Sequence, residues 1–256
     1  MRRLLPSTAL LTLLLAACAG TGEPGSGAET ESVARAVEPS LRAAAASAEA
    51  GMDWKGAAQH WRTLYARNPQ DKSAALSLAR ALRCAGQAQA ATDVLQQAIL
   101  RHGREPALVA ELGKAWLAAD RVGLALKTLD EAARLAPGQW DVHSAQGVAL
   151  DNADRFGEAQ DAYGRALALA PGNPTVLNNL ALSQAMAGRL DEAVANLLLA
   201  QDQPEAGPQT RQNLALLLAL KGDSVAAGRM AAKELPAEMV RSNAAYYRWL
   251  AENAAR

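Results

Sequence analysis

The sequence predicts an all-α protein, an α-solenoid of six consecutive helical hairpins followed by one further helix. Three observations support this fold class: an alanine at a fixed interval, a small residue that accompanies it, and apolar residues spaced by three and four around both. The interval is 34 residues, and the alanine recurs without insertion or deletion at Ala57, Ala91, Ala125, Ala159, Ala193 and Ala227. A fixed period of this length is typical of a repeat array.

The first helix of each unit carries a small residue at its eighth position. The units start at residues 38, 72, 106, 140, 174 and 208, and their eighth residues are Ala45, Ala79, Gly113, Gly147, Ala181 and Ala215. Two closely packed helices need a residue without bulk where their backbones approach, and we expect the eighth and twentieth positions to form that contact. Large apolar residues at the seventh, eleventh and twenty-fourth positions make the amphipathic stripe around it.

Short polar turns divide each unit into two helices. They read Ala85-Gly86-Gln87, Ala153-Asp154-Arg155, Ala187-Gly188-Arg189 and Lys221-Gly222-Asp223. A proline or glycine near the end of a unit stops the second helix, as at Pro69, Gly103, Pro137 and Pro171. Each unit from 38 to 241 is therefore expected to be an antiparallel helical hairpin.

A last helix is expected to follow the sixth unit. Pro236 opens a stretch in which Met239, Val240, Tyr247 and Leu250 stand near helical spacing. The final hairpin of a stack leaves an apolar face uncovered, and an added amphipathic helix covers it. We assign residues 242–256 to this capping helix.

The first residues are typical of a secretory signal with a lipid attachment site. Arg2 and Arg3 precede an apolar run from Leu4 to Ala17, which is too short to span a membrane. The ending Leu15-Ala16-Ala17-Cys18 resembles the lipobox of bacterial lipoproteins, which implies that residues 1–17 are removed and that the Cys18 sulfur receives a diacylglycerol group. An ordinary secretory signal with a chance cysteine is the alternative.

Two features after Cys18 extend this hypothesis. Ala19 stands where an aspartate would retain a Gram-negative lipoprotein in the inner membrane, so the resemblance implies an outer-membrane location facing the periplasm. Residues from Gly20 to about Glu31 are rich in Gly, Ser, Thr, Pro and Glu, and we expect residues 18–37 to form a flexible tether. Several acyl chains anchor a protein stably without a transmembrane helix.

Charge and cysteine content give no indication of a nucleic-acid-binding protein or of a disulfide. The chain has 26 basic and 26 acidic residues, and loss of Arg2 and Arg3 with the signal leaves a slight acidic excess. No basic patch suited to nucleic acid is evident. Lipidation of Cys18 would leave Cys84 without a partner, so we expect Cys84 to be a small buried residue.

The residues do not favour an enzyme, a metal site or a cofactor. His60, His102 and His143 fall at three different phases of the repeat and cannot readily converge on a metal ion. We expect His143 to be a partly exposed helix residue, although it and Gln146 stand at core positions. The sequence shows no Gly-rich phosphate loop, paired-cysteine motif or nucleophile elbow.

The positions described above, over about 38–241, resemble the tetratricopeptide repeat family. That resemblance implies a right-handed superhelix whose inner, concave wall consists of first helices and binds protein segments. The candidate binding residues on this wall are Arg80, Arg83, Lys114, Asp151, Asn152, Asn178, Asn179, Gln212 and Asn213. The amides among them can donate to and accept from an extended backbone. Alternatively, they bond to the neighbouring repeat or to a turn.

Two stretches, 176–183 and 211–216, together with Leu235-Pro236 followed by Asn243-Ala244-Ala245-Tyr246, resemble the TadD family of Flp pilus assembly. This resemblance implies a periplasm-facing outer-membrane lipoprotein that assists assembly of tight-adherence pili, with pilus or secretin subunits as partners and no nucleic acid. A pilotin of type IV pili, a general adaptor for periplasmic enzymes, and an enzyme with an unrecognised site are the alternatives.

Overall fold

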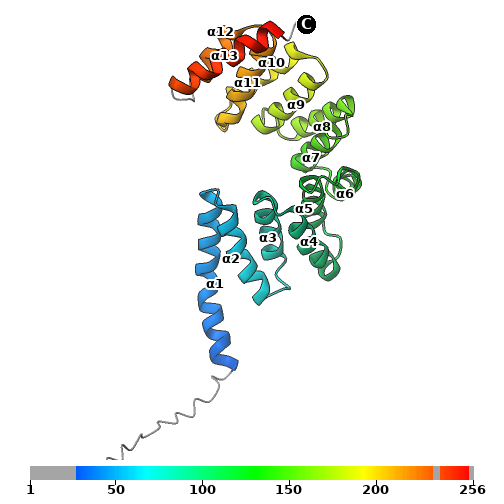
Figure 1. Ribbon diagram of the computed structural model, residues 1–256. Coiled ribbons are helices and arrows are strands. Elements are labelled where there is room, and N and C mark those ends of the chain that lie inside the picture. The colour runs from blue at the N-terminus through cyan, green and yellow to red at the C-terminus, as the bar shows by residue number, and fades with distance from the viewer. Residues whose placement is uncertain (1–26, 233–236, 254–256) are drawn as a thin grey trace, which may run out of the picture. The chain divides into compact units, whose positions relative to one another are not determined.

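The structure, a computed structural model, describes residues 27–232 and 237–253, and every regular element within them is an α-helix (Figure 1). The chain divides into two units, residues 1–40 and 41–256. The helices are α1 (Gly27–Ala50), α2 (Trp54–Arg67), α3 (Lys72–Cys84), α4 (Ala88–His102), α5 (Pro106–Ala118), α6 (Val122–Leu135), α7 (Trp140–Asp151), α8 (Phe156–Leu169), α9 (Pro174–Met186), α10 (Leu190–Gln201), α11 (Pro208–Leu220), α12 (Ser224–Ala231) and α13 (Ala237–Asn253).

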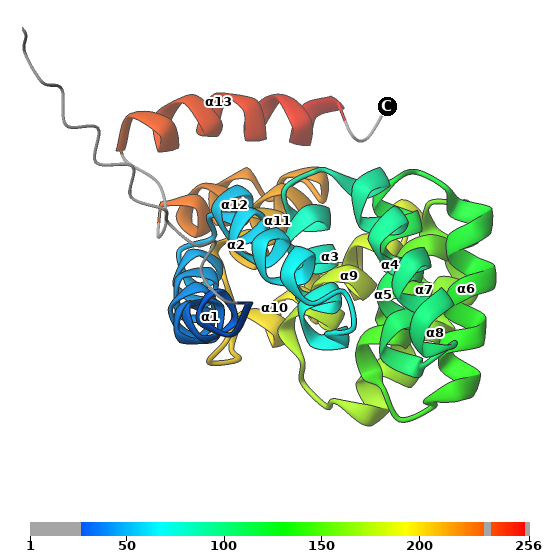
Figure 2. The ribbon, with the colours of Figure 1, turned by 90° about the horizontal axis from the view of Figure 1, so that it is seen from below.

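These helices form the stacked hairpins that the 34-residue period predicts. Helices α3 and α4, α5 and α6, α7 and α8, α9 and α10, and α11 and α12 pack pairwise, and each pair contacts the next (Figures 1 and 2). Residues of α1 from Leu41 onward share a buried cluster with Ala57 and Trp61 of α2, which makes the first hairpin. The fold is an all-α solenoid of tetratricopeptide-type hairpins, and helix α13 packs on α11 and α12 at its end.

Side-chain caps start several of these helices where the sequence places an acidic or amide residue. Asp53, Asp71 and Asp223 each accept a hydrogen bond from the backbone N–H three residues on, at 3.0, 2.9 and 2.8 Å. Asn173 caps α9 by accepting from Thr175 N and Val176 N. These bonds satisfy backbone donors that the first helical turn leaves without a partner.

All six hairpin turns place one residue in the left-handed region, at the fifteenth position of the unit. Glycine occupies it in three turns, with φ of 76° at Gly86, 81° at Gly188 and 96° at Gly222. Met52, Asp120 and Asp154 occupy it in the other three, with φ of 57°, 57° and 56°. A non-glycine residue is strained in this conformation, and methionine more than aspartate. The turn geometry therefore comes from the hairpin and not from glycine alone.

The small eighth residue lies where the two helices of a hairpin come closest. A Cβ atom on Gly113 would lie 2.7 Å from Leu129, and one on Gly147 would lie 2.5 Å from Tyr163. The nearest atoms to the eighth residue thus belong to the twenty-fourth position, and the expected contact with the twentieth position stays a prediction. Long helical side chains lean toward the start of their own helix, so Leu129 and Tyr163 reach back over the eighth residue.

The periodic alanines are all completely buried, as is the core around them. Ala57, Ala91, Ala125, Ala159, Ala193 and Ala227 are each 0% exposed. Buried leucines such as Leu78, Leu95 and Leu197 fill the space between hairpins. Each cluster joins two or three consecutive hairpins, so the core runs along the stack as a series of linked clusters.

The structure differs from the sequence-based expectations at both ends. Residues 27–37, assigned to the flexible tether, are the first part of helix α1, because Ala, Glu and Arg, which favour a helix, dominate them. The last helix spans Ala237–Asn253, where the assignment was 242–256. The signal peptide, Cys18 and the tether up to residue 26 lie outside the described residues.

Two residues differ in burial from what the sequence suggested. Cys84 is exposed, because it is the last residue of α3 and its side chain points away from the core. His143 is buried, with 8% of its surface exposed, because Pro137 and Gln146 provide hydrogen-bond partners inside the fold. The expectations of a buried Cys84 and a partly exposed His143 were therefore wrong.

The first helices of successive hairpins also contact one another, α3 with α5, α5 with α7, α7 with α9, and α9 with α11. Second helices make no comparable contacts with each other in the described part of the chain. The first helices therefore form the more closely packed side of the 41–256 unit, which we call the first-helix wall. None of the described helices combines the length and apolar character that crossing a bilayer requires.

Candidate protein-binding groove

A groove lies on the first-helix wall between α3, α5 and α7. It consists of two adjoining cavities of about 360 Å³ each, which share Lys114, Trp140 and Asp141. Apolar side chains line much of one cavity, namely Leu117, Ala118, Ala145 and Val148. Polar and charged side chains line the other, namely Arg80, Glu111 and Gln139. Such a mixed lining suits a protein segment with both apolar and charged residues.

Two of the predicted binding cations in this groove are held in ion pairs between repeats. Arg83 Nε donates to Glu111 Oε1 at 2.7 Å, and Lys114 Nζ lies 2.5 Å from Asp141 Oδ2. The Glu111 side chain is only 6% exposed, so removal of Arg83 would leave a buried carboxylate without its partner. Arg83 and Lys114 therefore stabilise the stack as well as line the groove.

Arg80 differs from these two cations. Its side chain is exposed at the edge of the groove, and it takes part in none of the ion pairs within residues 27–232 and 237–253. A solvated guanidinium in that position is available to an incoming carboxylate or backbone carbonyl. Among the predicted site residues, Arg80 is the cation best placed to contact a partner.

Trp140 is a groove residue that the sequence analysis missed. It is the first residue of α7 and lines both cavities. Three of the other first helices begin with proline, at Pro106, Pro174 and Pro208, so an aromatic residue at this position stands out. Tryptophan combines a large apolar surface with one hydrogen-bond donor, which makes it a common anchor at protein interfaces.

The predicted site residue Asp151 is engaged inside the fold. It accepts hydrogen bonds from Tyr163 Oη at 2.8 Å and from Ser183 Oγ at 2.6 Å, and so links α7 with α8 and α9. Burial raises the pKa of Asp151 above its usual range, although both hydrogen bonds oppose that change. Its neighbour Asn152 caps the end of α7 and is exposed. Asp151 thus connects two repeats.

The amides predicted to contact a backbone bond partly to one another. Asn213 Nδ2 donates to Asn178 Oδ1 at 2.8 Å, which joins the fifth and sixth hairpins, and Gln209 Nε2 donates to Asn213 Oδ1 at 3.1 Å. Asn178 is buried, and its Nδ2 lies 3.4 Å from Asn179 Oδ1. Asn178 and Asn213 therefore bond to each other across neighbouring repeats, which was the alternative considered for these amides.

The amides lie apart from the groove, and their role as a binding surface stays a prediction. The fourth amide, Gln212, is exposed and lines a separate cavity of about 260 Å³ between α11, α12 and α13. Seven of the predicted residues thus form a basic group at α3 and α5 and an amide group at α9 and α11, and the other two, Asp151 and Asn152, lie at the end of α7. The structure places only the basic group in the groove.

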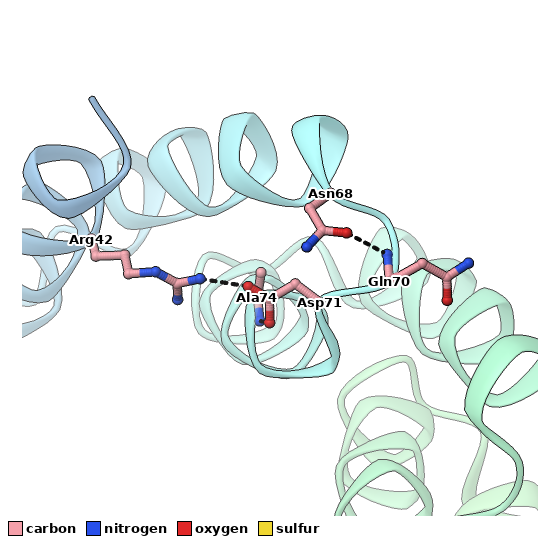
Figure 3. A network of polar contacts seen from close by, with 5 residues as sticks. All are labelled: Arg42, Asn68, Gln70, Asp71 and Ala74. Atoms are coloured by element: carbon pink, nitrogen blue, oxygen red, sulfur yellow. Dashed lines mark hydrogen bonds and ion pairs between the residues drawn. The ribbon is translucent and has the colours of Figure 1, made fainter. Parts of the chain in front are cut away.

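Further ion pairs tie the early hairpins together. Arg42 of α1 donates to Asp71 Oδ2 at 2.5 Å while Asp71 also caps α3, and Asn68 Oδ1 accepts from Gln70 N nearby (Figure 3). Burial alone would raise the pKa of Asp71, but the hydrogen bonds from Ala74 N and Arg42 outweigh it and hold that pKa below its usual value. Lys72 pairs in the same way with Glu105.

The described residues contain no group of three or more His, Cys, Asp and Glu side chains suited to a metal ion. His143 hydrogen-bonds to Pro137 and Gln146, and His60 and His102 lie on α2 and α4. The groove itself presents cations, two ion-paired carboxylates at Glu111 and Asp141, and apolar surface. This arrangement can bind a polypeptide.

No known protein-family model matches the chain, and no curated protein matches it. Among solved structures, TTC0263, a thermophilic TPR protein of Thermus thermophilus, is 24% identical with a TM-score of 0.65, over 71% of this chain and 98% of that chain. MamA 41-end from Desulfovibrio magneticus RS-1 is 18% identical with a TM-score of 0.51, over 62% and 92% of the two chains. At these identities the likeness shows the fold alone, that of a tetratricopeptide repeat protein.

Proposed function

We propose that this protein is a non-enzymatic scaffold that binds a segment of another protein in the groove between α3, α5 and α7. The observation that supports this function most directly is the groove itself, two adjoining cavities with Trp140 shared between them and Arg80 at the edge. Solenoids of helical hairpins present extended surfaces of this kind to their partners. The apolar cavity has room for a hydrophobic side chain, and the Arg80 guanidinium can donate hydrogen bonds to a carboxylate or carbonyl oxygen beside it.

The finer proposal is that the scaffold is anchored at Cys18 in the outer membrane, faces the periplasm and assists assembly of Flp pili or of their secretion machinery. The lipobox-like Leu15–Cys18, Ala19 after the cysteine, and the stretches 176–183 and 211–216 support it. Confinement by the lipid raises the local concentration of the bound pair at the membrane surface without new contacts. A pilotin-like role in type IV pili and a general adaptor role are the alternatives.

Charge reversal at the groove edge tests the binding proposal. Arg80→Glu places a carboxylate where the free guanidinium stands, and Arg62→Glu makes the same change at an exposed position of α2 away from the groove. After in-cell crosslinking, recovery of pilus or secretin subunits with the Arg80→Glu protein should fall by about tenfold, the effect of one lost charge-assisted contact. Recovery with Arg62→Glu should match the unaltered protein. Equal recovery with both variants would argue against this groove.

Removal of the acceptor thiol tests the anchor separately. The Cys18→Ser protein should leave the membrane fraction and should reduce piliation, while its circular dichroism spectrum and melting curve stay unchanged. Normal piliation by soluble protein would show that the anchor has no part in the function. The neighbouring genes distinguish the alternatives. A Flp prepilin gene nearby supports the role in Flp pilus assembly, and type IV pilus genes support the pilotin-like role. Catalytic turnover that tracks the protein through purification would refute a non-enzymatic role.

A further inference from the structure

The ion pairs of the groove can be compared from one repeat to the next, because equivalent residues stand 34 positions apart. Lys114 is the ninth residue of its unit, and its Nζ atom lies 2.5 Å from Oδ2 of Asp141, the second residue of the following unit. One unit earlier, the same two positions hold Arg80 and Ala107. Both residues are exposed and line one cavity of about 360 Å³. Arg80 therefore has a methyl group at the position where the next repeat provides a carboxylate.

The second ion pair of the groove has an apolar counterpart one repeat later. Arg83 Nε donates to Glu111 Oε1 at 2.7 Å, which joins the twelfth residue of one unit to the sixth residue of the next. The equivalent residues one unit later are Leu117 and Ala145. Both are partly exposed and line the other cavity of about 360 Å³, together with Val148. An apolar surface between α5 and α7 thus replaces the ion pair that joins α3 and α5.

The groove therefore combines one excess cation with one apolar surface. The charged residues that line its two cavities are three cations and two carboxylates, namely Arg80, Arg83, Lys114, Glu111 and Asp141. The two ion pairs include four of these five residues, and Arg80 is the fifth. Because the two cavities adjoin at Trp140, one segment can reach both. A segment that is negative in one part and apolar in another is complementary to this lining.

We propose that the segment bound in this groove carries an aspartate or glutamate whose carboxylate pairs with Arg80, and a large apolar side chain that packs on Leu117 and Val148. The inference rests on the proposed scaffold function and adds the chemistry of the partner to it. The carboxylate lies beside Ala107, in the place that the Asp141 carboxylate has one repeat later. The apolar side chain lies in the neighbouring cavity, which is large enough for it.

Two features of α3 and α5 favour a carboxylate at this place. The cation of the missing pair is an arginine, whose planar guanidinium binds a carboxylate with two parallel hydrogen bonds. The first turn of a helix also favours negative charge, because its N–H groups carry partial positive charge. In α7 Asp141 provides that charge, whereas the first turn of α5 contains no acidic residue. A ligand carboxylate beside Ala107 therefore interacts with both the guanidinium and the start of α5.

Synthetic peptides test this chemistry without knowledge of the natural partner. The protein, residues 18–256 with Cys18→Ser, carries a photoreactive residue at Ala118, which is exposed and lines the groove. It is crosslinked to a library of random dodecapeptides that are acetylated and amidated, so that no terminal carboxylate takes part. Peptides trapped at Ala118, and not at the exposed Ala168 of α8, should contain an aspartate or glutamate near a large apolar residue. Replacement of that acid by its amide should weaken binding about tenfold, the effect of one lost charge-assisted contact.

Three substitutions connect the preference for an acid to Arg80. Ala107→Asp supplies the missing carboxylate from the protein itself, so it should abolish the preference for the acidic peptide over its amide form. Arg80→Gln removes the cation and should abolish the preference as well. Ala107→Asn, which matches aspartate in size but has no charge, should keep it. Ala107 and Arg80 are exposed, so all three variants should give the circular dichroism spectrum of the unaltered chain.

The outcomes separate this inference from the proposed scaffold function. A preference for the acid that survives Ala107→Asp or Arg80→Gln would overturn the inference. Peptides trapped at Ala118 whose binding does not depend on an acid would also overturn it, while the groove would remain a binding site. Equal trapping at Ala118 and Ala168, or no trapping at either position, would contradict both the inference and the scaffold function.

Discussion

Substitution of Gly147 by alanine is expected to destabilise the fourth hairpin, although alanine is the better helix former. The new Cβ atom would lie 2.5 Å from Cε1 and 2.6 Å from Cζ of Tyr163. Tyr163 is 1% exposed, and its hydroxyl donates to Asp151, so the ring cannot move without losing that bond and disturbing its packing. Gly164, on the exposed side of α8, has no atom within 4 Å of an added Cβ and serves as the matched control.

The size of the effect follows from three contributions. Overpacking of a well-packed core costs about 2 kcal/mol, and a weakened Tyr163 hydrogen bond costs about 1 kcal/mol. Replacement of glycine inside a helix gains about 1 kcal/mol. Gly147→Ala should therefore lower the free energy of unfolding by about 2 kcal/mol. Gly164→Ala should raise it by about 0.5–1 kcal/mol, since only the helix preference applies.

Urea unfolding followed by circular dichroism at 222 nm compares the two variants with the unaltered chain at one protein concentration. The midpoint should fall for Gly147→Ala and rise for Gly164→Ala. Because a repeat array can unfold in parts, the midpoint and the slope are both compared. If Gly147→Ala is as stable as Gly164→Ala, the eighth position does not need a small residue and the packing argument fails.

Three further predictions concern single side chains. Met52→Gly should raise the free energy of unfolding by about 0.5–1 kcal/mol, because glycine adopts the left-handed conformation of this residue without strain. Met186→Gly, at the end of α9, should not raise it. A lower free energy of unfolding in Met52→Gly would show that the methionine is not strained. Asp71→Asn should be less stable than the unaltered chain at pH 7, and this difference in stability should vanish as pH falls through the lowered pKa of Asp71. A difference that does not depend on pH would show that the negative charge of Asp71 does not stabilise the fold. In a Cys18→Ser protein, Cys84 should react with Ellman's reagent at the rate of a free thiol without denaturant; reaction only after unfolding would show that the thiol is protected.

The helical hairpins could be predicted because their determinants are local and repeat at one period. A small residue at the eighth position, a buried alanine at the twentieth and a breaker at the end set where each helix lies. The five later first helices begin at Lys72, Pro106, Trp140, Pro174 and Pro208, the residues from which the repeats were counted. The twenty-fourth-position contact of Gly113 and Gly147 was missed, because the lean of a long side chain along its helix does not show in a list of spacings.

The ion pairs of the groove could not be predicted from the period. Arg83 pairs with Glu111 across 28 residues and Lys114 with Asp141 across 27, neither of which equals one repeat. Long side chains reach to whichever opposite charge the next first helix brings within range, and that choice depends on the packing of two helices. The sequence therefore identified Arg80, Arg83 and Lys114 as wall residues but could not tell which one stays free.

The burial of single polar residues could not be predicted from the sequence either. His143 was expected to be partly exposed, yet a carbonyl oxygen at Pro137 and the amide of Gln146 provide the partners that burial requires. These partners come from the connection before α7 and from α7 itself, and Asp130 of α6 completes the set. Such a network exists only once two hairpins have packed together.

Photocrosslinking from the groove tests the central claim most directly, that the first-helix wall holds a protein segment. A photoreactive residue at Ala118, an exposed position that lines the groove, is compared in living cells with one at Ala168, an exposed position on α8. We predict that Ala118 traps one defined segment of a pilus-assembly or secretin subunit, that Ala168 does not, and that Trp140→Ala abolishes the trapped product. Equal products from both positions, or an unchanged product in Trp140→Ala, would contradict the claim.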